Sequence, residues 1–209
     1  MPPHDRYTER VKEDIARYWD ERYRGRGEEE RPPADFLVRH IDLLPGPGRA
    51  LDVAMGTGRN ALFLASRGYE VTGIDISPLA VERCQQEAQR RGLRIETICA
   101  NLESYPLLAE TFGVVLNLYY LQRELCPRLV EALRPGGVLV FETFTLEQPR
   151  FGWGPREEEF LLRPGELREL FLELEVLVYR ESIEEEDERG MKAVAGLVGR
   201  KRVAPPELP

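Results

Sequence analysis

The residues best suited to chemistry lie in one stretch, residues 50–60, with the sequence ALDVAMGTGRN. Asp52 stands in an apolar run that suits a strand buried on both faces. Gly56 and Gly58 then allow a tight turn whose backbone can approach a ligand closely, and a helical segment follows. A glycine turn between a strand and a helix leaves backbone N–H groups and a helix N-terminus at a crevice of the sheet. The stretch therefore predicts a site for a nucleotide-like ligand.

Asp52 discriminates between two ligands of this kind. Residues 56–61, GTGRNA, also fit the G-x-G-x-x-A pattern of dinucleotide sites. A pyrophosphate is anionic and would be repelled by a neighbouring carboxylate. S-adenosylmethionine (SAM) carries an amino group and a sulfonium, and both would be attracted. Asp52 therefore favours SAM, and a glycine turn that binds nothing is the alternative.

Further polar residues follow the next two predicted strands. Asp75 ends the second strand, where a carboxylate can accept hydrogen bonds from both hydroxyls of a ribose; otherwise it is an ordinary strand-end aspartate. Asn101 and Leu102 follow the third strand. An amide there can bond an adenine edge and the leucine can flank the ring, unless Asn101 only forms an Asx turn.

Strands and helices alternate along the part of the chain that must position these residues. Short links between them predict a parallel, doubly wound sheet. The expected strands are 50–54, 70–75, 95–100, 114–118 and 138–144, and the expected helices are 60–67, 78–91 and 127–133. A short helix at 164–171 and two strands, 174–183 and 193–202, follow; the acidic turn 184–190 should join the two strands as an antiparallel hairpin.

The N-terminal part of the chain predicts a separate helical unit. Residues 5–23 have the spacing of an amphipathic helix, with Tyr18, Trp19 and Tyr23 near one face. This helix either packs on the domain or forms a lid whose aromatic side chains face a ligand. A glycine- and proline-containing loop at 25–33 and a short helix at 36–44 should follow.

Together these pieces resemble the motif series of class I SAM-dependent methyltransferases. The matching segments are 51–58 (LDVAMGTG), Asp75, Asn101-Leu102 and 133–137 (LRPGG), and the resemblance spans residues 49–202. Within the class, residues 18–23 (YWDERY) and 58–60 (GRN) are similar to tellurite-resistance (TehB-like) and thiopurine-type small-molecule methyltransferases. The resemblance implies an α/β, Rossmann-like sheet of seven strands in the order 3-2-1-4-5-7-6, the last strand antiparallel, under an N-terminal helical lid.

The resemblance also implies SAM as cofactor, S-adenosylhomocysteine as product, and a role for each matched residue. Those implied to hold the methionine part are Asp52, Ala54, Gly56 and Gly58. Those implied around the ribose and adenine are Asp75, Ile76, Asn101 and Leu102. Those implied beside the sulfonium or over the cofactor are Asn117, Tyr18, Trp19 and Arg22. Three positions depart from the pattern of the class: Ala54 replaces a glycine, Asn101 an aspartate, and Gly113 an aspartate of many relatives.

The acceptor site should lie at the ends of the fourth and fifth strands. Methyl transfer is an in-line displacement, so alignment supplies much of the rate, and a base is needed only if the acceptor must lose a proton. Glu142 is the best-placed base, although strand-end glutamates are often structural. The residues predicted to bind the acceptor are Tyr119, Tyr120, Arg123 and Trp153. Arg123 either binds an anionic acceptor or pairs on a helix surface.

Three other functions are weighed against methyl transfer. An NAD(P)-dependent oxidoreductase would explain the glycine turn and Asp75 but not Asp52. A nucleic-acid base methyltransferase would carry Asn-Pro-Pro-aromatic where this chain has Asn-Leu-Tyr-Tyr at 117–120. A non-catalytic SAM-binding protein would keep the same motifs. We therefore expect a methyltransferase (EC 2.1.1) whose small-molecule acceptor offers a sulfur, chalcogen, nitrogen or oxygen nucleophile.

Composition limits the expected partners, localisation and metal content of the protein. The 209 residues carry a net charge of −8 without a long basic run, which disfavours a nucleic-acid partner. No apolar leader or membrane-length segment is present, so a cytoplasmic protein without a membrane partner is expected. Cys84, Cys99 and Cys126 have no zinc or redox spacing, and no metal is predicted. One domain is expected over 1–209, with a lid at 1–48, a core at 49–202 and a flexible tail at 203–209.

Overall fold

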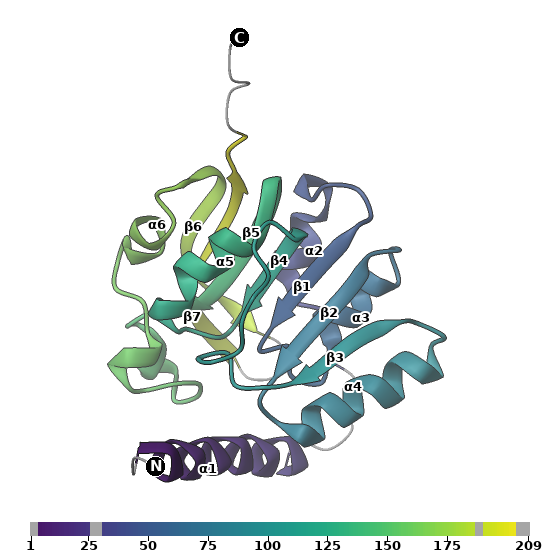
Figure 1. Ribbon diagram of the computed structural model, residues 1–209. Helices are drawn as coiled ribbons and strands as arrows, with labels where there is room; N and C mark the ends of the chain where they lie inside the picture. Colours follow the sequence, from purple (N-terminus) through teal and green to yellow (C-terminus); the bar gives the residue numbers. More distant parts are fainter. Residues whose placement is uncertain (1–3, 26–30, 187–189, 204–209) are drawn as a thin grey trace.

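A single sheet of seven strands forms the middle of the protein (Figure 1). The computed structural model describes residues 4–25 (side chains from residue 15), 31–186 and 190–203. The strand order is β3-β2-β1-β4-β5-β7-β6. The first five strands pair in parallel, and β7 runs antiparallel to both β5 and β6. The predicted fold class and strand order are therefore confirmed.

The central strands consist almost entirely of apolar residues because helices cover both faces of the sheet. All seven residues of β4 are buried, as are all residues of β1 after the first. The strands are β1 (Arg49–Val53), β2 (Glu70–Asp75), β3 (Ile95–Cys99), β4 (Phe112–Leu118), β5 (Leu133–Phe144), β6 (Leu174–Glu186) and β7 (Gly190–Lys201).

Helices form two layers around the sheet. One core contains side chains of α5 and α6, and the other contains side chains of α2 and α3. The helices are α1 (His4–Gly25), α2 (Asp35–Arg39), α3 (Arg59–Ala65), α4 (Pro78–Arg90), α5 (Cys126–Ala132) and α6 (Glu166–Leu170), with 3-10 turns η1 (Ile41–Leu43), η2 (Arg123–Leu125), η3 (Gln148–Phe151) and η4 (Glu158–Phe160). None of the helices within the described residues is both long and apolar enough to cross a membrane.

Figure 1 shows α1 lying across the carboxyl ends of the parallel strands, beside the start of α4. Helix α4 begins where predicted, because the Ser77 hydroxyl accepts a hydrogen bond from the backbone N–H of Ala80 at 3.1 Å and Pro78 occupies the first turn. The glycine turn after β1 and the end of β2 therefore lie against α1.

Several predicted boundaries differ from the structure. The helix expected at 36–44 is divided at His40 into α2 and η1. Strand β5 begins at Leu133, whose extended backbone ends α5, and so includes the proline and glycines at 135–137. Residues 184–186 of the expected hairpin turn belong to β6. Residues 187–189, 26–30 of the N-terminal loop and 204–209 of the tail lie outside the described residues.

Candidate functional site

The turn after β1 requires its glycines. Gly56 and Gly58 have φ of +58° and +86°, in the left-handed region that glycine enters without strain. A Cβ on Gly56 would lie 2.8 Å from the Tyr23 hydroxyl of α1, and one on Gly58 would collide with Sγ of Cys84. Ala54, at the position where the class has a glycine, also has a positive φ of 50°. Two chain segments therefore pack directly on this turn.

Asp52 presents a buried carboxylate beside the turn. Its side chain is 1% exposed, and Oδ2 has no hydrogen-bond partner among the described residues. Burial raises the pKa of Asp52 to about 7, opposed by the charge of Arg59 and by the backbone N–H of Ala61. A buried acceptor without a partner is costly. The unpartnered carboxylate oxygen of Asp52 could therefore accept a hydrogen bond from a cationic group such as the amino group of SAM.

Asp75 is tied into the turn by the backbone. Its Oδ2 accepts from the N–H of Gly56 at 2.8 Å, and its Oδ1 accepts from the N–H of Ser77 at 2.9 Å. Burial raises the pKa of Asp75, and these N–H donors oppose the rise. Each carboxylate oxygen retains a lone pair, so the carboxylate has acceptor capacity for the two hydroxyls of a ribose.

The residues after β3 are arranged mainly by local contacts. Asn101 forms the Asx turn that the sequence left open, since its Oδ1 accepts from the N–H of Glu103 at 2.9 Å. Its amide nitrogen lies 3.4 Å from a Glu103 carboxylate oxygen. Leu102 is buried in the core beside α5. The carbonyl of Ile76 accepts from Sγ of Cys99 at 3.7 Å, which joins the ends of β2 and β3.

Helix α1 is anchored to the start of α4, next to this group. Asp20 accepts hydrogen bonds from the Ser77 hydroxyl and from the backbone N–H of Leu79, the latter at 3.3 Å. Arg83 of α4 donates to the carbonyl of Tyr23 at 2.8 Å. The guanidinium of Arg22 lies 5.8 Å from the ring of Tyr18 and 5.7 Å from that of Trp19, and Tyr18 is 54% exposed. The predicted lid residues therefore lie on a helix that covers the end of β2.

The predicted acceptor residues cluster after β4 and β5. Asn117 donates to the carbonyl of Tyr120 at 2.7 Å and so shapes the turn after β4. Tyr119 in that turn has a positive φ of 64°. Its ring centroid lies 5.4 Å from that of Phe144, which in turn meets Trp153 at 5.6 Å. The Tyr120 hydroxyl donates to Gln122 at 3.0 Å. Tyr119, Phe144 and Trp153 thus lie together, whereas Tyr120 packs against the core that contains α5 and α6.

Arg123 has internal partners for its guanidinium. It pairs with Glu166 of α6 at 2.7 Å and donates to the carbonyls of Glu159 at 2.7 Å and Leu161 at 2.9 Å. The hydrogen bond from Arg123 lowers the pKa of Glu166 to about 2. These contacts favour the structural alternative for Arg123 over binding of an anionic acceptor.

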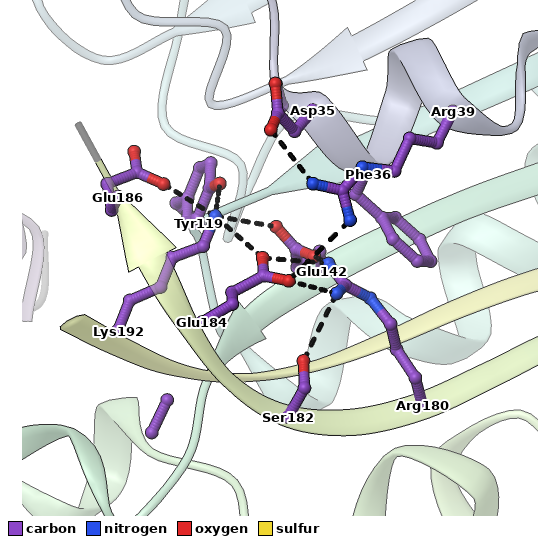
Figure 2. A network of polar contacts seen from close by, with 12 residues as sticks. Asp35, Phe36, Arg39, Tyr119, Glu142, Arg180, Ser182, Glu184, Glu186 and Lys192 are labelled. Atoms are coloured by element: carbon purple, nitrogen blue, oxygen red, sulfur yellow. Dashed lines mark hydrogen bonds and ion pairs between the residues drawn. The ribbon is translucent and has the colours of Figure 1, made fainter.

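Glu142 belongs to a buried ionic network that the sequence did not predict (Figure 2). Arg180 pairs with Glu142 at 2.5 Å, and Nζ of Lys192 lies 3.7 Å from Glu142 Oε1. Lys192 also contacts Glu184 at 3.2 Å and Glu186 at 2.6 Å. The available signal was Lys192 itself, a lysine that directly precedes the apolar run 193–199 of β7.

Metal ligands do not converge in the part of the chain that the structure describes: no group of three His, Cys, Asp or Glu side chains there could hold an ion. An open groove of about 880 Å³ is lined by residues of β2, β3 and α4, together with Arg49 at the start of β1 and Tyr69 just before β2. None of the predicted site residues lines it.

Comparisons with known proteins find a family match over part of the chain. The family model described as methyltransferase domain matches residues 50–137. The ribosomal protein L11 methyltransferase of Thermus thermophilus is 36% identical over 118 residues, which cover 54% of this chain and 44% of that protein. The chain spans about half the length of the curated relatives it matches.

Solved structures share the fold across most of the chain. TehB from Haemophilus influenzae is similar with a TM-score of 0.69 at 22% identity, covering 88% of this chain and 67% of TehB. A structure from work on the conversion of a disulfide bond into a thioacetal group during echinomycin biosynthesis has a TM-score of 0.67 at 23% identity, covering 92% and 94% of the two chains. These neighbours confirm the Rossmann-like fold expected from the motifs.

Proposed function

We propose that this protein, whose residues 50–137 belong to the methyltransferase-domain family, transfers the methyl group of SAM to a small-molecule acceptor. The observation that carries the proposal is Asp52, a buried carboxylate with an unpartnered oxygen beside the glycine turn. A dinucleotide's pyrophosphate would be repelled there, whereas the amino group of SAM would supply the missing partner. This argument also disfavours the NAD(P)-dependent alternative.

In this proposal each predicted cofactor residue keeps the task that the resemblance implies. Asp52 holds the amino group, and the turn from Ala54 to Gly58 lies against the methionine part. Asp75 accepts from the ribose hydroxyls. The adenine lies among Ile76, Asn101 and Leu102, and Asn117 borders the sulfonium. The lid, residues 1–48, places Tyr18, Trp19 and Arg22 over the site. When bound, SAM supplies an electrophilic methyl group, and the protein orients it and excludes water.

The acceptor side is proposed to be formed by Tyr119, Tyr120 and Trp153. Aromatic surfaces of this kind suit a small molecule with an apolar or planar part. Arg123 and Glu142 also stand among the predicted residues, but the Arg123 guanidinium is bound to Glu166 and the Glu142 side chain is buried. The net charge of −8 supports a small molecule over a nucleic acid as acceptor.

Calorimetric titration with S-adenosylhomocysteine, with NADH as the competing probe, tests the proposal. Wild type should bind S-adenosylhomocysteine and not NADH. Asp75→Ala should weaken binding by about 10- to 100-fold, because hydrogen bonds to a charged group contribute about 1.5–3 kcal/mol. Asp42→Ala, which changes an exposed aspartate of η1, is the matched control and should bind as wild type does.

Two outcomes would contradict the proposal. Binding of NADH in place of S-adenosylhomocysteine would make the protein a dinucleotide enzyme. Binding of S-adenosylhomocysteine without turnover of SAM, over a panel of thiols, amines and phenols, would favour the non-catalytic SAM-binding alternative.

A further inference from the structure

Glu142 cannot itself reach a bound acceptor. Its side chain is 0% exposed, in a strand whose neighbours β4 and β7 lie on either side. Its Oε2 pairs with Arg180, yet its Oε1 has no hydrogen-bond partner among the described residues. A buried carboxylate oxygen that lacks a partner needs a reason. If Glu142 takes a proton from the acceptor, another group must carry it.

Tyr119 shares a neighbour with Glu142 and also lines a small cavity. The Tyr119 hydroxyl and Glu142 Oε1 share one neighbour, Lys192 Nζ, at 2.8 and 3.7 Å respectively (Figure 2). Tyr119 also lines a cavity of about 30 Å³ together with Arg59, residues 32–35, Glu185 and Glu186. Such a cavity has room for a water molecule. Tyr119 therefore contacts the lysine that neighbours the buried carboxylate, and it lines a cavity whose water could exchange protons with bulk solvent.

The position of Tyr119 is held from several directions. Its backbone is left-handed, at a φ of 64°, which a bulky residue rarely adopts outside functional sites. Its N–H donates to the carbonyl of Glu142 at 2.7 Å. The Arg59 guanidinium, from the first residue of α3, lies 5.2 Å from the ring centroid. Arg59 directly follows the glycine turn, so Tyr119 adjoins the proposed cofactor site.

We propose that Tyr119 and Glu142 form a proton relay for the acceptor, with Lys192 as the residue that positions the tyrosine. This inference rests on the proposed function and identifies the groups that would remove a proton from the acceptor. Lys192, 1% exposed, donates to the hydroxyl oxygen of Tyr119. The tyrosine keeps a second lone pair for the acceptor. Its own proton can pass to Glu142 Oε1 once the hydroxyl turns toward that oxygen, which has no hydrogen-bond partner among the described residues.

The relay balances as a transfer of one proton along two bonds. As the acceptor heteroatom bonds to the methyl carbon, its proton passes to the Tyr119 oxygen and the tyrosine's proton passes to Glu142 Oε1. The carbon–sulfur bond breaks with its electron pair on sulfur. Glu142 becomes a neutral carboxylic acid and Lys192 stays an ammonium ion. The proton later returns through Tyr119 to water in the cavity.

The charges around Glu142 determine the pH range in which its carboxylate is ionised and can accept a proton. Burial raises the pKa of Glu142, and the cations Lys192 and Arg180 oppose the rise. Glu184 and Glu186 face the same two cations from β6, since Glu184 contacts both and Glu186 contacts Lys192. From the N-terminal segment and α2, Arg31 pairs with Glu186 at 3.5 Å, and Arg39 lies 3.9 Å from Glu184 and 3.1 Å from Asp35. Burial therefore favours the protonated form of Glu142, and the neighbouring cations favour the ionised form.

Nuclear magnetic resonance of ring-labelled tyrosine tests the relay without an identified acceptor. The Cζ resonance of Tyr119, assigned with Tyr119→Phe, is followed against pH with S-adenosylhomocysteine present. We expect an inflection from the titration of Glu142 that disappears in Glu142→Gln. Glu184→Gln is the matched control, because it removes a carboxylate from the same cations and should leave the inflection in place. Lys192→Met should shift the resonance, whereas Lys201→Met, on the same strand, should not.

The result that overturns the relay is a Tyr119 signal that responds equally to Glu142→Gln and Glu184→Gln, or to neither. If Lys192→Met fails to fold, the comparison of Glu142→Gln with Glu184→Gln still tests the relay. With a turned-over acceptor, Tyr119→Phe and Glu142→Gln should each lower kcat by about 100-fold or more, and the double variant no further. Failure of wild type to bind S-adenosylhomocysteine would instead refute the proposed function.

Discussion

Backbone strain concentrates at single residues of the site. Ala54 has a φ of 50° at the entrance to the glycine turn, where a Cβ costs about 1–2 kcal/mol. Replacing it with glycine removes this strain but adds entropy to the unfolded chain, about 0.4–1 kcal/mol. We therefore expect Ala54→Gly to raise the free energy of unfolding by about 0.5–1 kcal/mol, measured by urea denaturation.

The control for this prediction is Ala65→Gly at the last residue of α3. There the backbone is helical, so glycine should lower the free energy of unfolding by about 0.5–1 kcal/mol. Equal destabilisation by both substitutions would show that the positive φ of Ala54 carries no strain.

What could be predicted for a residue depended on how local its contacts are. The glycine turn and Asp75 follow from the sequence, because glycine backbone and strand-end placement are local properties. For Asn101 the sequence left two alternatives, an adenine-binding amide and an Asx turn. The structure contains the Asx turn, in which Oδ1 accepts from the N–H two residues further along the chain. Arg123 is held by Glu166, 43 residues away, and nothing near Arg123 in the sequence indicates that partner.

At the scale of elements, the attachment of α1 to α4 is the contact most open to test. Asp20 accepts from the Ser77 hydroxyl and the Leu79 N–H at the start of α4, where a carboxylate also interacts favourably with the helix dipole. We expect Asp20→Ala to release α1, to speed its cleavage by trypsin and to weaken binding of S-adenosylhomocysteine by about 3- to 10-fold, as expected for the loss of about 1 kcal/mol.

Glu21→Ala provides the comparison, because Glu21 is the next residue and is exposed. It should leave both cleavage and binding unchanged. If the two variants behave alike, the Asp20 contacts do not hold the helix over the site, and the proposed lid loses its support.

The elements themselves were largely predictable, whereas their lateral contacts were not. Glycines, prolines and apolar runs mark strands and helices directly, and the order of the sheet came from the resemblance. The ionic network depends on the pairing of β5 with β7 and β6, which brings Glu142, Lys192 and Arg180 together from positions up to 50 residues apart. Register between distant strands is set by the assembled sheet.

At the scale of the whole molecule, the fold places carboxylates inside a protein that already carries a net charge of −8. Burial raises the pKa of Asp52, Asp75 and Glu142. A carboxyl whose pKa is higher in the folded state stabilises that state while protonated, and the benefit is lost as pH rises through the folded pKa. Glu166 acts in the opposite sense, but its pKa of about 2 places its effect at more acidic pH.

Asp52 should therefore make the ligand-free protein less stable as pH rises from about 5.5 to 8. Its pKa of about 7 implies a loss of roughly 2 kcal/mol over this range. In Asp52→Asn the dependence should flatten, leaving the part due to Asp75 and Glu142, whereas Asp42→Asn should keep the full slope. Thermal unfolding at several pH values measures this.

The same thermal unfolding experiment, repeated with S-adenosylhomocysteine, tests whether Asp52 binds the ligand. If the amino group of S-adenosylhomocysteine pairs with ionised Asp52, the ligand favours the form that burial disfavours. The rise in Tm on adding S-adenosylhomocysteine should then be larger at pH 8 than at pH 5.5, and this difference should shrink in Asp52→Asn. A ligand effect independent of pH in wild type would mean that Asp52 does not meet the amino group, and the charge argument for SAM would fail with it.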